Sequence, residues 1–177
     1  GRLLRQRGRG QVVGFEESAK WRAVLADQIA AEGLSDFVSL IHAPLTETEG
    51  MERVVPWYNP EIVRSALERI GSIDLLVVDG PVMTETYSRW PALPFFRPWL
   101  ANGATVVLDD VNRAAEAAVL AAWRTEFDLS VALDTGTAHG QAYIELTPLV
   151  PDGIPDEAAR PMSPGGTSAH GGRRESQ

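Results

Sequence analysis

The chain has 177 residues, no cysteine and a net charge of −8 at neutral pH. The lack of cysteine excludes disulfides and thiolate metal sites and fits a cytoplasmic protein, while the negative charge argues against general nucleic-acid affinity. No apolar run approaches the roughly 20 residues of a membrane-spanning helix, so we expect neither a nucleic-acid nor a membrane partner.

The start of the chain has the pattern of the last turns of a helix. Leu3 and Leu4 are followed by arginines and then by Gly8 and Gly10, which are typical helix stops. No residue precedes Gly1 to complete such a helix. We therefore expect that the sequence lacks an N-terminal piece.

The first half of the chain alternates apolar runs with helical stripes. Ser18 is a candidate N-cap of one helix, and Asn59 followed by Pro60 is a typical start of another. Gly33 and Gly71 are suited to end these two helices. In chain order, the predicted elements are a strand over 11–15, a helix over 18–33, a strand over 37–41, a loop over 46–58 and a helix over 59–71.

The second half is organised around an apolar run that ends in Asp79-Gly80-Pro81. Five of the six residues from Ile73 to Val78 are apolar, which is typical of a strand buried on both faces of a parallel sheet. The last two apolar runs have no helix between them, so we expect an antiparallel pair at the sheet edge. In chain order, the predicted elements are a strand over 73–79, a loop over 82–89, a helix carrying residues 91–100, a turn at 102–103, a strand over 104–108, a helix over 112–127 and strands over 129–133 and 141–146.

These elements predict an α/β fold. The order βαβαβαβαββ indicates a doubly wound, mostly parallel sheet with helices on both faces and an antiparallel C-terminal strand pair. We place this domain at residues 1–148. Residues 149–177 are rich in Gly and Pro and poor in large apolar residues, so we expect a disordered tail.

Four acids stand where predicted strands end. Glu16 closes the first strand, where an acid can bind ribose hydroxyls or can be stabilised by the dipole of the next helix. Asp79 and the pair Asp109-Asp110 follow two successive parallel strands and should lie side by side. They could hold Mg²⁺ or Ca²⁺, or one could act as a general base. The alternatives are turn chemistry for Asp79 and an N-cap for Asp110.

Two arginines lie in or near the loops after these strands. Arg89 and Arg113 could each orient an anionic substrate through a forked contact. The alternative is that they pair with the neighbouring acids Asp79 and Asp109.

The remaining chemistry-bearing residues give weaker signals. His42 and His139 are isolated in the sequence, and such histidines are usually structural or surface residues. Trp57, Tyr58 and Tyr87 could line the mouth of a pocket. Simple packing is the default interpretation of these aromatic residues.

Taken together, the chain resembles the class I S-adenosylmethionine (SAM)-dependent methyltransferases, and within them a small-molecule O-methyltransferase-like group. The resemblance covers about residues 1–147 and rests on the order and spacing of its motifs. These motifs are Asp79-Gly80-Pro81, Arg89-Trp90-Pro91-Ala92-Leu93, Leu108-Asp109-Asp110-Val111-Asn112-Arg113 and Trp123.

The resemblance implies SAM as the cofactor and a small molecule as the substrate. It implies that Glu16 binds the adenosyl ribose, that Ala43-Pro44-Leu45 lies near the adenine, and that Asp79 lies beside the methionine end of the cofactor. Some related O-methyltransferases bind a divalent metal through acids at the positions of Asp79, Asp109 and Asp110.

The chain departs from this pattern at its start. The family's first strand and glycine-rich loop have no counterpart in the sequence, so we expect a Rossmann-like methyltransferase fold lacking its first strand. That strand is normally central, between the strands at 11–15 and 73–79. We expect these two strands to flank an unfilled slot or to pair in a non-native way, and we expect cofactor binding by this truncated chain to be impaired.

The predicted function is methyl transfer from SAM to a small-molecule hydroxyl or amine, with Asp79 or Asp109 as candidate base. One alternative is an NAD-dependent oxidoreductase, against which the antiparallel last strand pair weighs. The other is a non-catalytic remnant that acts as an interaction domain.

Overall fold

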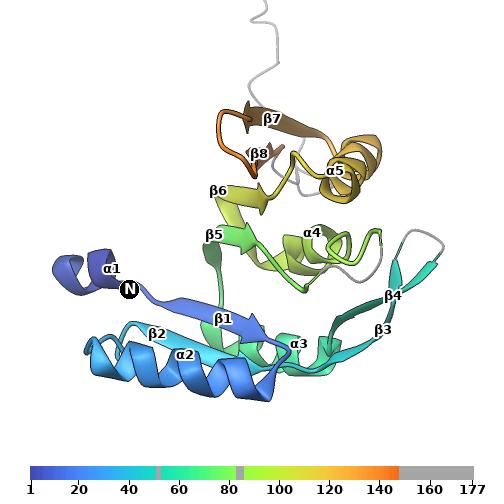
Figure 1. Cartoon of the computed structure of the whole chain (residues 1–177). Coiled ribbons are helices and arrows are strands. Elements are labelled where there is room, and N and C mark those ends of the chain that lie inside the picture. Colours follow the sequence, from blue (N-terminus) through green and yellow to red (C-terminus); the bar gives the residue numbers. More distant parts are fainter. Residues whose placement is uncertain (51–52, 83–85, 148–177) are drawn as a thin grey trace, which may run out of the picture.

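The protein is described by a computed structural model that covers residues 1–50, 53–82 and 86–147 (Figure 1). The tail predicted over 149–177 lies outside the described residues. The helices are α1 (Arg2–Arg7), α2 (Ala19–Ala31), α3 (Pro60–Ile70), α4 (Ala92–Phe96), the 3₁₀ turn η1 (Arg97–Trp99) and α5 (Ala114–Glu126). The strands are β1 (Val12–Glu16), β2 (Val38–His42), β3 (Leu45–Gly50), β4 (Arg53–Tyr58), β5 (Ile73–Val78), β6 (Leu100–Asp109), β7 (Leu129–Asp134) and β8 (Gln141–Leu146).

The main sheet has the strand order β5-β6-β8-β7. Strands β5 and β6 are parallel, whereas β8 is antiparallel to both β6 and β7. The predicted α/β fold with an antiparallel C-terminal pair is therefore confirmed, and β8 lies between β6 and β7.

Strands β1 and β2 form a separate parallel pair. Figure 1 shows this pair, with α2 lying along it, set apart from the main sheet. Among the described residues β1 makes no strand pairing with β5, so the outcome is an open slot and not a non-native pairing. The edges of β1 and β5 that face this slot have no strand partner in the described part of the chain.

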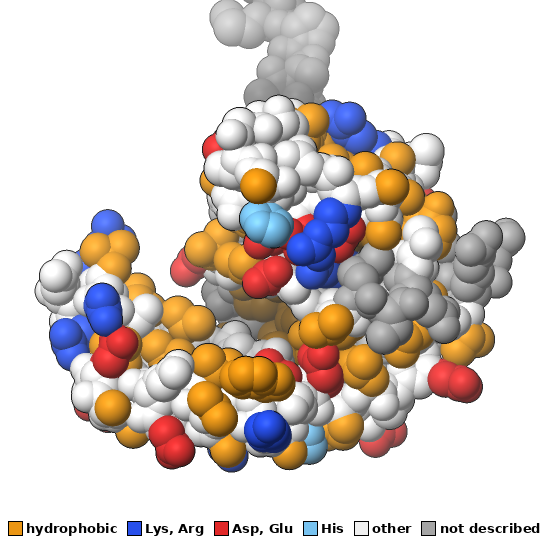
Figure 2. Space-filling model, viewed as in Figure 1, with side chains coloured by type: hydrophobic (Ala, Val, Ile, Leu, Met, Phe, Trp, Pro, Cys, Tyr) orange, Lys and Arg blue, Asp and Glu red, His pale blue; other side chains and the backbone are white. Residues whose placement is uncertain are grey.

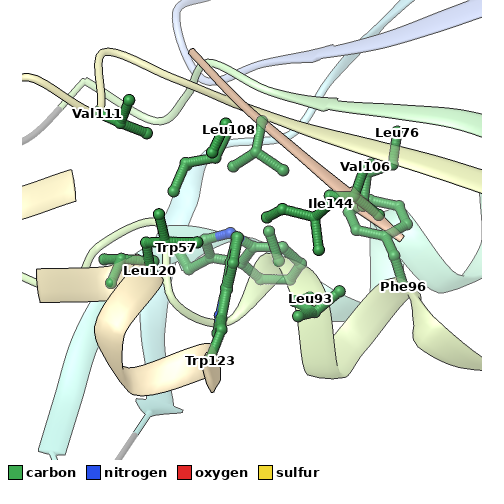
Figure 3. Packing of buried hydrophobic residues seen from close by; sticks show 14 of the residues in the cluster. Trp57, Leu76, Leu93, Phe96, Val106, Leu108, Val111, Leu120, Trp123 and Ile144 are labelled. Atoms are coloured by element: carbon green, nitrogen blue, oxygen red, sulfur yellow. The ribbon is translucent and has the colours of Figure 1, made fainter. Parts of the chain in front are cut away.

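The hydrophobic core lies on one face of the main sheet. Helices α4 and α5 supply Leu93 and Trp123, which pack with Val106 of β6 and Ile144 of β8 (Figure 3). Helix α3 adds Leu67 to the same core. Each of these five side chains is at most 1% exposed. This packing fixes the carboxyl ends of β5 and β6, where the site lies.

The prediction that β5 is buried on both faces is wrong. Leu76 and Val78 are buried in the core, but Leu75 and Val77 on the opposite face are each 57% exposed. The reason is that, within the described residues, the core helices α3, α4 and α5 cover only the first of these faces.

The predicted helix starts and stops are confirmed. The Ser18 hydroxyl accepts a hydrogen bond from the Trp21 amide, and the Asn59 side chain accepts from the amides of Glu61 and Ile62. Gly8 ends α1 in the left-handed conformation with φ of 66°.

The prediction of a loop over 46–58 is wrong, because β3 and β4 form an antiparallel pair there. In β4 the side chains of Val55 and Trp57 are buried whereas Val54 is 57% exposed. This alternation drives the strand, but it is only a few residues long and is interrupted by Pro56.

The prediction of a turn at 102–103 is also wrong. Asn102 and Gly103 lie inside β6, which starts at Leu100, and the pairing of β5 with β6 shifts register at this point. Gly103 has a φ of 79°, so the glycine serves the irregular strand and not a turn. The helix predicted over 91–100 divides into α4 and η1 and ends before Leu100.

Candidate active site

Three carboxylates meet at the carboxyl ends of β5 and β6. The pairing of Val78 with Leu108 brings the two strands level, so Asp79, Asp109 and Asp110 follow at the same edge. One ligand atom from each of these acids lies within 4.8 Å of those from the other two. The exposure differs, because the Asp79 side chain is 67% exposed and that of Asp110 is 8% exposed.

Arg89 lies behind this cluster and is only 3% exposed. Its Nη1 donates to the backbone oxygen of Asp109 at 3.2 Å, and its Nη2 lies 3.4 Å from Asp110 Oδ2 and 3.7 Å from Asp79 Oδ1. The guanidinium thus contacts all three acidic positions. This position matches the alternative interpretation of the sequence, in which Arg89 pairs with neighbouring acids.

Glu116 is a fourth carboxylate of this network, and the sequence did not single it out. It lies in the first turn of α5, is 0% exposed and has its Oε1 3.5 Å from Arg89 Nη1. Neither of its carboxylate oxygens has a hydrogen-bond partner among the described residues. Arg89 therefore lies between a buried carboxylate and the strand-end acids.

The Asp110 carboxylate is fully engaged. Its Oδ2 lies 2.8 Å from Arg113 Nη1, and its Oδ1 lies 2.9 Å from His139 Nδ1. Asp110 is not the N-cap of α5, because Arg113 holds that position. His139 contacts the acid cluster directly, although it is isolated in the sequence. Arg113 is the more exposed of the two predicted substrate-binding arginines, at 52% of its side chain.

The carboxylates of Asp79 and Asp109 have fewer contacts than that of Asp110. Partial burial raises the pKa of Asp79, Arg89 lowers it, and the carboxylates of Asp109 and Asp110 raise it further, so the net direction is upward. Asp109 Oδ1 accepts a hydrogen bond of 3.2 Å from Gln141 Nε2.

A second group of polar atoms lies at the end of β1. Glu16 Oε1 accepts a 2.8 Å hydrogen bond from the Ser18 amide, which leaves Oε2 without a partner among the described residues. The adjoining loop is tied to this strand, because the Ala43 amide donates to the Glu16 backbone oxygen at 3.0 Å. Ala43 is 0% exposed, Pro44 is exposed and Leu45 begins β3.

Tyr58 connects the two groups. Its ring lies 6.4 Å from that of Phe15 at the end of β1, between ring centroids. A Cβ added to Gly80 would come within 2.2 Å of the Tyr58 hydroxyl, so a larger residue at this position would require the tyrosine to shift. Trp57 is buried in the core, as the packing interpretation expects, but Tyr58 reaches the edge where the acids lie.

Glu17 makes a further connection between β1 and β5. The amide of Val82, just after Asp79-Gly80-Pro81, donates to Glu17 Oε1 at 3.4 Å. The backbone oxygen of Glu17 lies 3.1 Å from His42 Nε2, which gives that histidine a structural partner.

Figure 2 shows acidic, basic and histidine side chains gathered on the main-sheet side of a hollow that separates it from the β1–β2 pair. A cavity of about 120 Å³, lined by residues that include Asn102 and Thr147, lies at the other end of β6 and takes no part in this site. No helix in the described part of the chain has the length and apolar character needed to cross a membrane.

A sheet with acids at the carboxyl ends of neighbouring parallel strands is the architecture of nucleotide-cofactor-binding α/β proteins. Residues 1–111 match the family model described as a methyltransferase domain. The chain belongs to this family, and it is a class I SAM-dependent methyltransferase by fold. This match favours methyl transfer over the NAD-dependent alternative. No curated protein sequence matches the chain significantly.

Solved structures support the fold. The O-methyltransferase from Bacillus cereus in complex with SAH (S-adenosylhomocysteine) has a TM-score of 0.58 and 13% identity. The match covers 78% of this chain and 63% of that protein. The SAH-bound methyltransferase PaMTH1 from Podospora anserina has a TM-score of 0.57 and 17% identity, over 78% of this chain and 61% of its own. A putative O-methyltransferase from Klebsiella pneumoniae has a TM-score of 0.55 and 15% identity, over 78% and 63%. The chain thus spans less than two thirds of the length of each of these structures.

Proposed function

We propose that the protein transfers a methyl group from SAM to a hydroxyl, or an amine, of a small molecule, and that it does so in the cytoplasm. The observation that carries this proposal is the placement of Glu16 and Asp79 at the carboxyl ends of β1 and β5 in a chain of the methyltransferase family. The O-methyltransferase from Bacillus cereus and the methyltransferase PaMTH1, both named with SAH, support the choice of cofactor.

The residues at the end of β1 fit the adenosyl part of SAM. Glu16 is half-buried and its Oε2 has no partner among the described residues, so it can accept a hydrogen bond from a ribose hydroxyl. The backbone bond between Ala43 and Glu16 holds the following loop beside that carboxylate. We assign the adenine to the loop Ala43-Pro44-Leu45.

SAM supplies a methyl group on a sulfonium, which the acceptor displaces in line. The protein's part is to orient the acceptor and to take its proton. Asp79 is our candidate for the proton acceptor, because its carboxylate is exposed at the strand end and partial burial raises its pKa above the ordinary value. Asp109, whose carboxylate is held by Gln141, is the second candidate. Arg113 is our candidate for contacting the substrate, because its side chain is 52% exposed.

The acid cluster fits a divalent metal only in part. Asp79 and Asp109 each have carboxylate oxygen available, but both oxygens of Asp110 are occupied by Arg113 and His139. A metal held by all three acids would have to share the Asp110 carboxylate with Arg113 and His139. We therefore assign no catalytic role to a metal. Calorimetric titration of the protein with Mg²⁺ tests the predicted metal site.

Calorimetric titration with SAM and with S-adenosylhomocysteine tests the proposed function. We expect both to bind with impaired affinity, and we expect Glu16→Ala to weaken both further by about tenfold or more, because a hydrogen bond to a charged group contributes about 1.5–3 kcal/mol. Glu68→Ala, an exposed acid on α3, is the control that leaves both affinities unchanged. Binding of neither ligand, or equal binding by Glu16→Ala, contradicts the proposal.

A further inference from the structure

Tyr58 is held in place by its backbone. It is the last residue of β4 and pairs with Leu45, the first residue of β3. The next amide, that of Asn59, donates to the Pro44 backbone oxygen at 2.9 Å. Since Asn59 also caps α3, the backbone around Tyr58 is fixed to the loop that we assign to the adenine.

The side chain of Tyr58 is held as well. Its ring packs against the rings of Phe15 and Trp57, at centroid distances of 6.4 Å and 5.9 Å. Its hydroxyl lies against the backbone of Gly80, at the place where any Cβ would stand. A ring confined on both sides cannot swing away without losing these contacts. The hydroxyl is therefore a fixed feature of the edge between β1 and β5.

The surroundings of this hydroxyl are acidic. Burial raises the pKa of Tyr58 above its ordinary value, and so do the carboxylates of Glu17, Glu16 and Asp79, while Arg89 opposes them. The phenol stays neutral at physiological pH, and it makes no hydrogen bond to any other described residue. Its oxygen is a free acceptor in a negative environment, which suits a cationic ligand group.

We propose that the Tyr58 hydroxyl binds the sulfonium group of SAM, and that it lets the protein distinguish SAM from its product, in which the sulfur is uncharged. The inference rests on the proposed function, in which the cofactor extends from Glu16 toward Asp79. Tyr58 contacts Phe15, the residue before Glu16, and Gly80, the residue after Asp79. The sulfonium lies between the ribose and methionine ends of SAM. S-adenosylhomocysteine has a neutral sulfur at this position, so the negative environment favours SAM over it.

Tyr58→Phe removes the oxygen and keeps the ring. We expect the affinity for SAM to fall about fivefold and the affinity for S-adenosylhomocysteine to change less than twofold, measured by calorimetry. A merely structural role of Tyr58 would weaken both ligands equally. Equal losses, or no change for either ligand, overturn the inference while leaving the proposed function intact. If the unaltered protein binds neither ligand, both are overturned.

A mutant cycle with Gly80 tests the placement of the hydroxyl without any ligand. Gly80→Ala places a Cβ at 2.2 Å from the hydroxyl oxygen, whereas the next nearest Tyr58 atom, Cζ, stays at 3.4 Å. We expect Gly80→Ala alone to lower Tm by about 5 °C, as overpacking does. In the Tyr58→Phe background the same change should lower Tm by less than about 2 °C. Equal losses in the two backgrounds overturn the placement and with it the inference.

Discussion

Replacing Arg89 with methionine tests how much the ion pairs behind the acid cluster contribute to the free energy of unfolding. The change keeps most of the side-chain volume and removes the charge that contacts Glu116, Asp110 and Asp79. Glu116 is then left 0% exposed, with no hydrogen bond and with Arg113 Nη1 at 3.9 Å as its remaining cation.

The cost can be apportioned among these acids. Asp79 contributes little, because its side chain is 67% exposed and a solvated pair is worth about 0–1 kcal/mol. Asp110 keeps Arg113 at 2.8 Å and so stays compensated. Glu116 carries most of the loss, since breaking a buried pair costs about 3–5 kcal/mol. We expect Arg89→Met to lower the free energy of unfolding by about that amount at pH 7.

Urea unfolding followed by tryptophan fluorescence measures this loss, and a second substitution shows its source. Arg89→Met combined with Glu116→Met removes both charges, so most of the lost stability should return, because an apolar pair of similar volume is often neutral. Additive losses in the double variant would refute the reasoning.

Two further predictions concern the ionisation of Tyr58 and the hydrophobic core. In a spectrophotometric titration we expect Tyr58 to ionise only well above the ordinary tyrosine pKa of about 10. Because its folded pKa is raised, its contribution to stability is full below the unfolded pKa of about 10 and is lost as the pH rises toward the folded pKa. Tyr58→Phe should therefore gain on the unaltered protein only above about pH 10. Leu108→Ala, at a side chain 0% exposed, should cost about 2–5 kcal/mol in urea unfolding. The matched control Leu75→Ala, 57% exposed on the neighbouring strand, should stay within about 0.5 kcal/mol; equal losses at the two leucines would contradict the assignment of the core to one face.

The elements that the sequence predicts well are those with local causes. The caps at Ser18 and Asn59 satisfy helix amides with a side chain two or three residues away, so the signal and its partner lie in one short segment. The proximity of Asp79 to Asp109 follows from one rule, that parallel strands end at a common edge. Neither inference needs knowledge of distant contacts.

The features that the sequence does not predict depend on distant partners. Glu116 is a polar residue in an alanine-rich helix, and its nearer cation, Arg89, lies 27 residues earlier in the chain. The role of Tyr58 depends on Phe15, which lies in β1, and on Gly80, which follows β5. The exposed face of β5 was missed for a similar reason, since the apolar pattern of a strand shows which residues can be buried and not which faces a helix covers.

Side chains, and not sheet hydrogen bonds, set the distance between the two halves of the site. Strands β1 and β5 share no pairing among the described residues, yet the ring of Phe15 lies 6.1 Å from that of Phe96 in the core, between centroids. The Glu17–Val82 hydrogen bond and the contact of Tyr58 with Gly80 join the two strand ends at the edge itself. Since interactions of this kind are worth about 1 kcal/mol each, the spacing of Glu16 and Asp79 depends on a few residues. Replacing Gly80 with a larger residue should therefore disturb the geometry of the cofactor site.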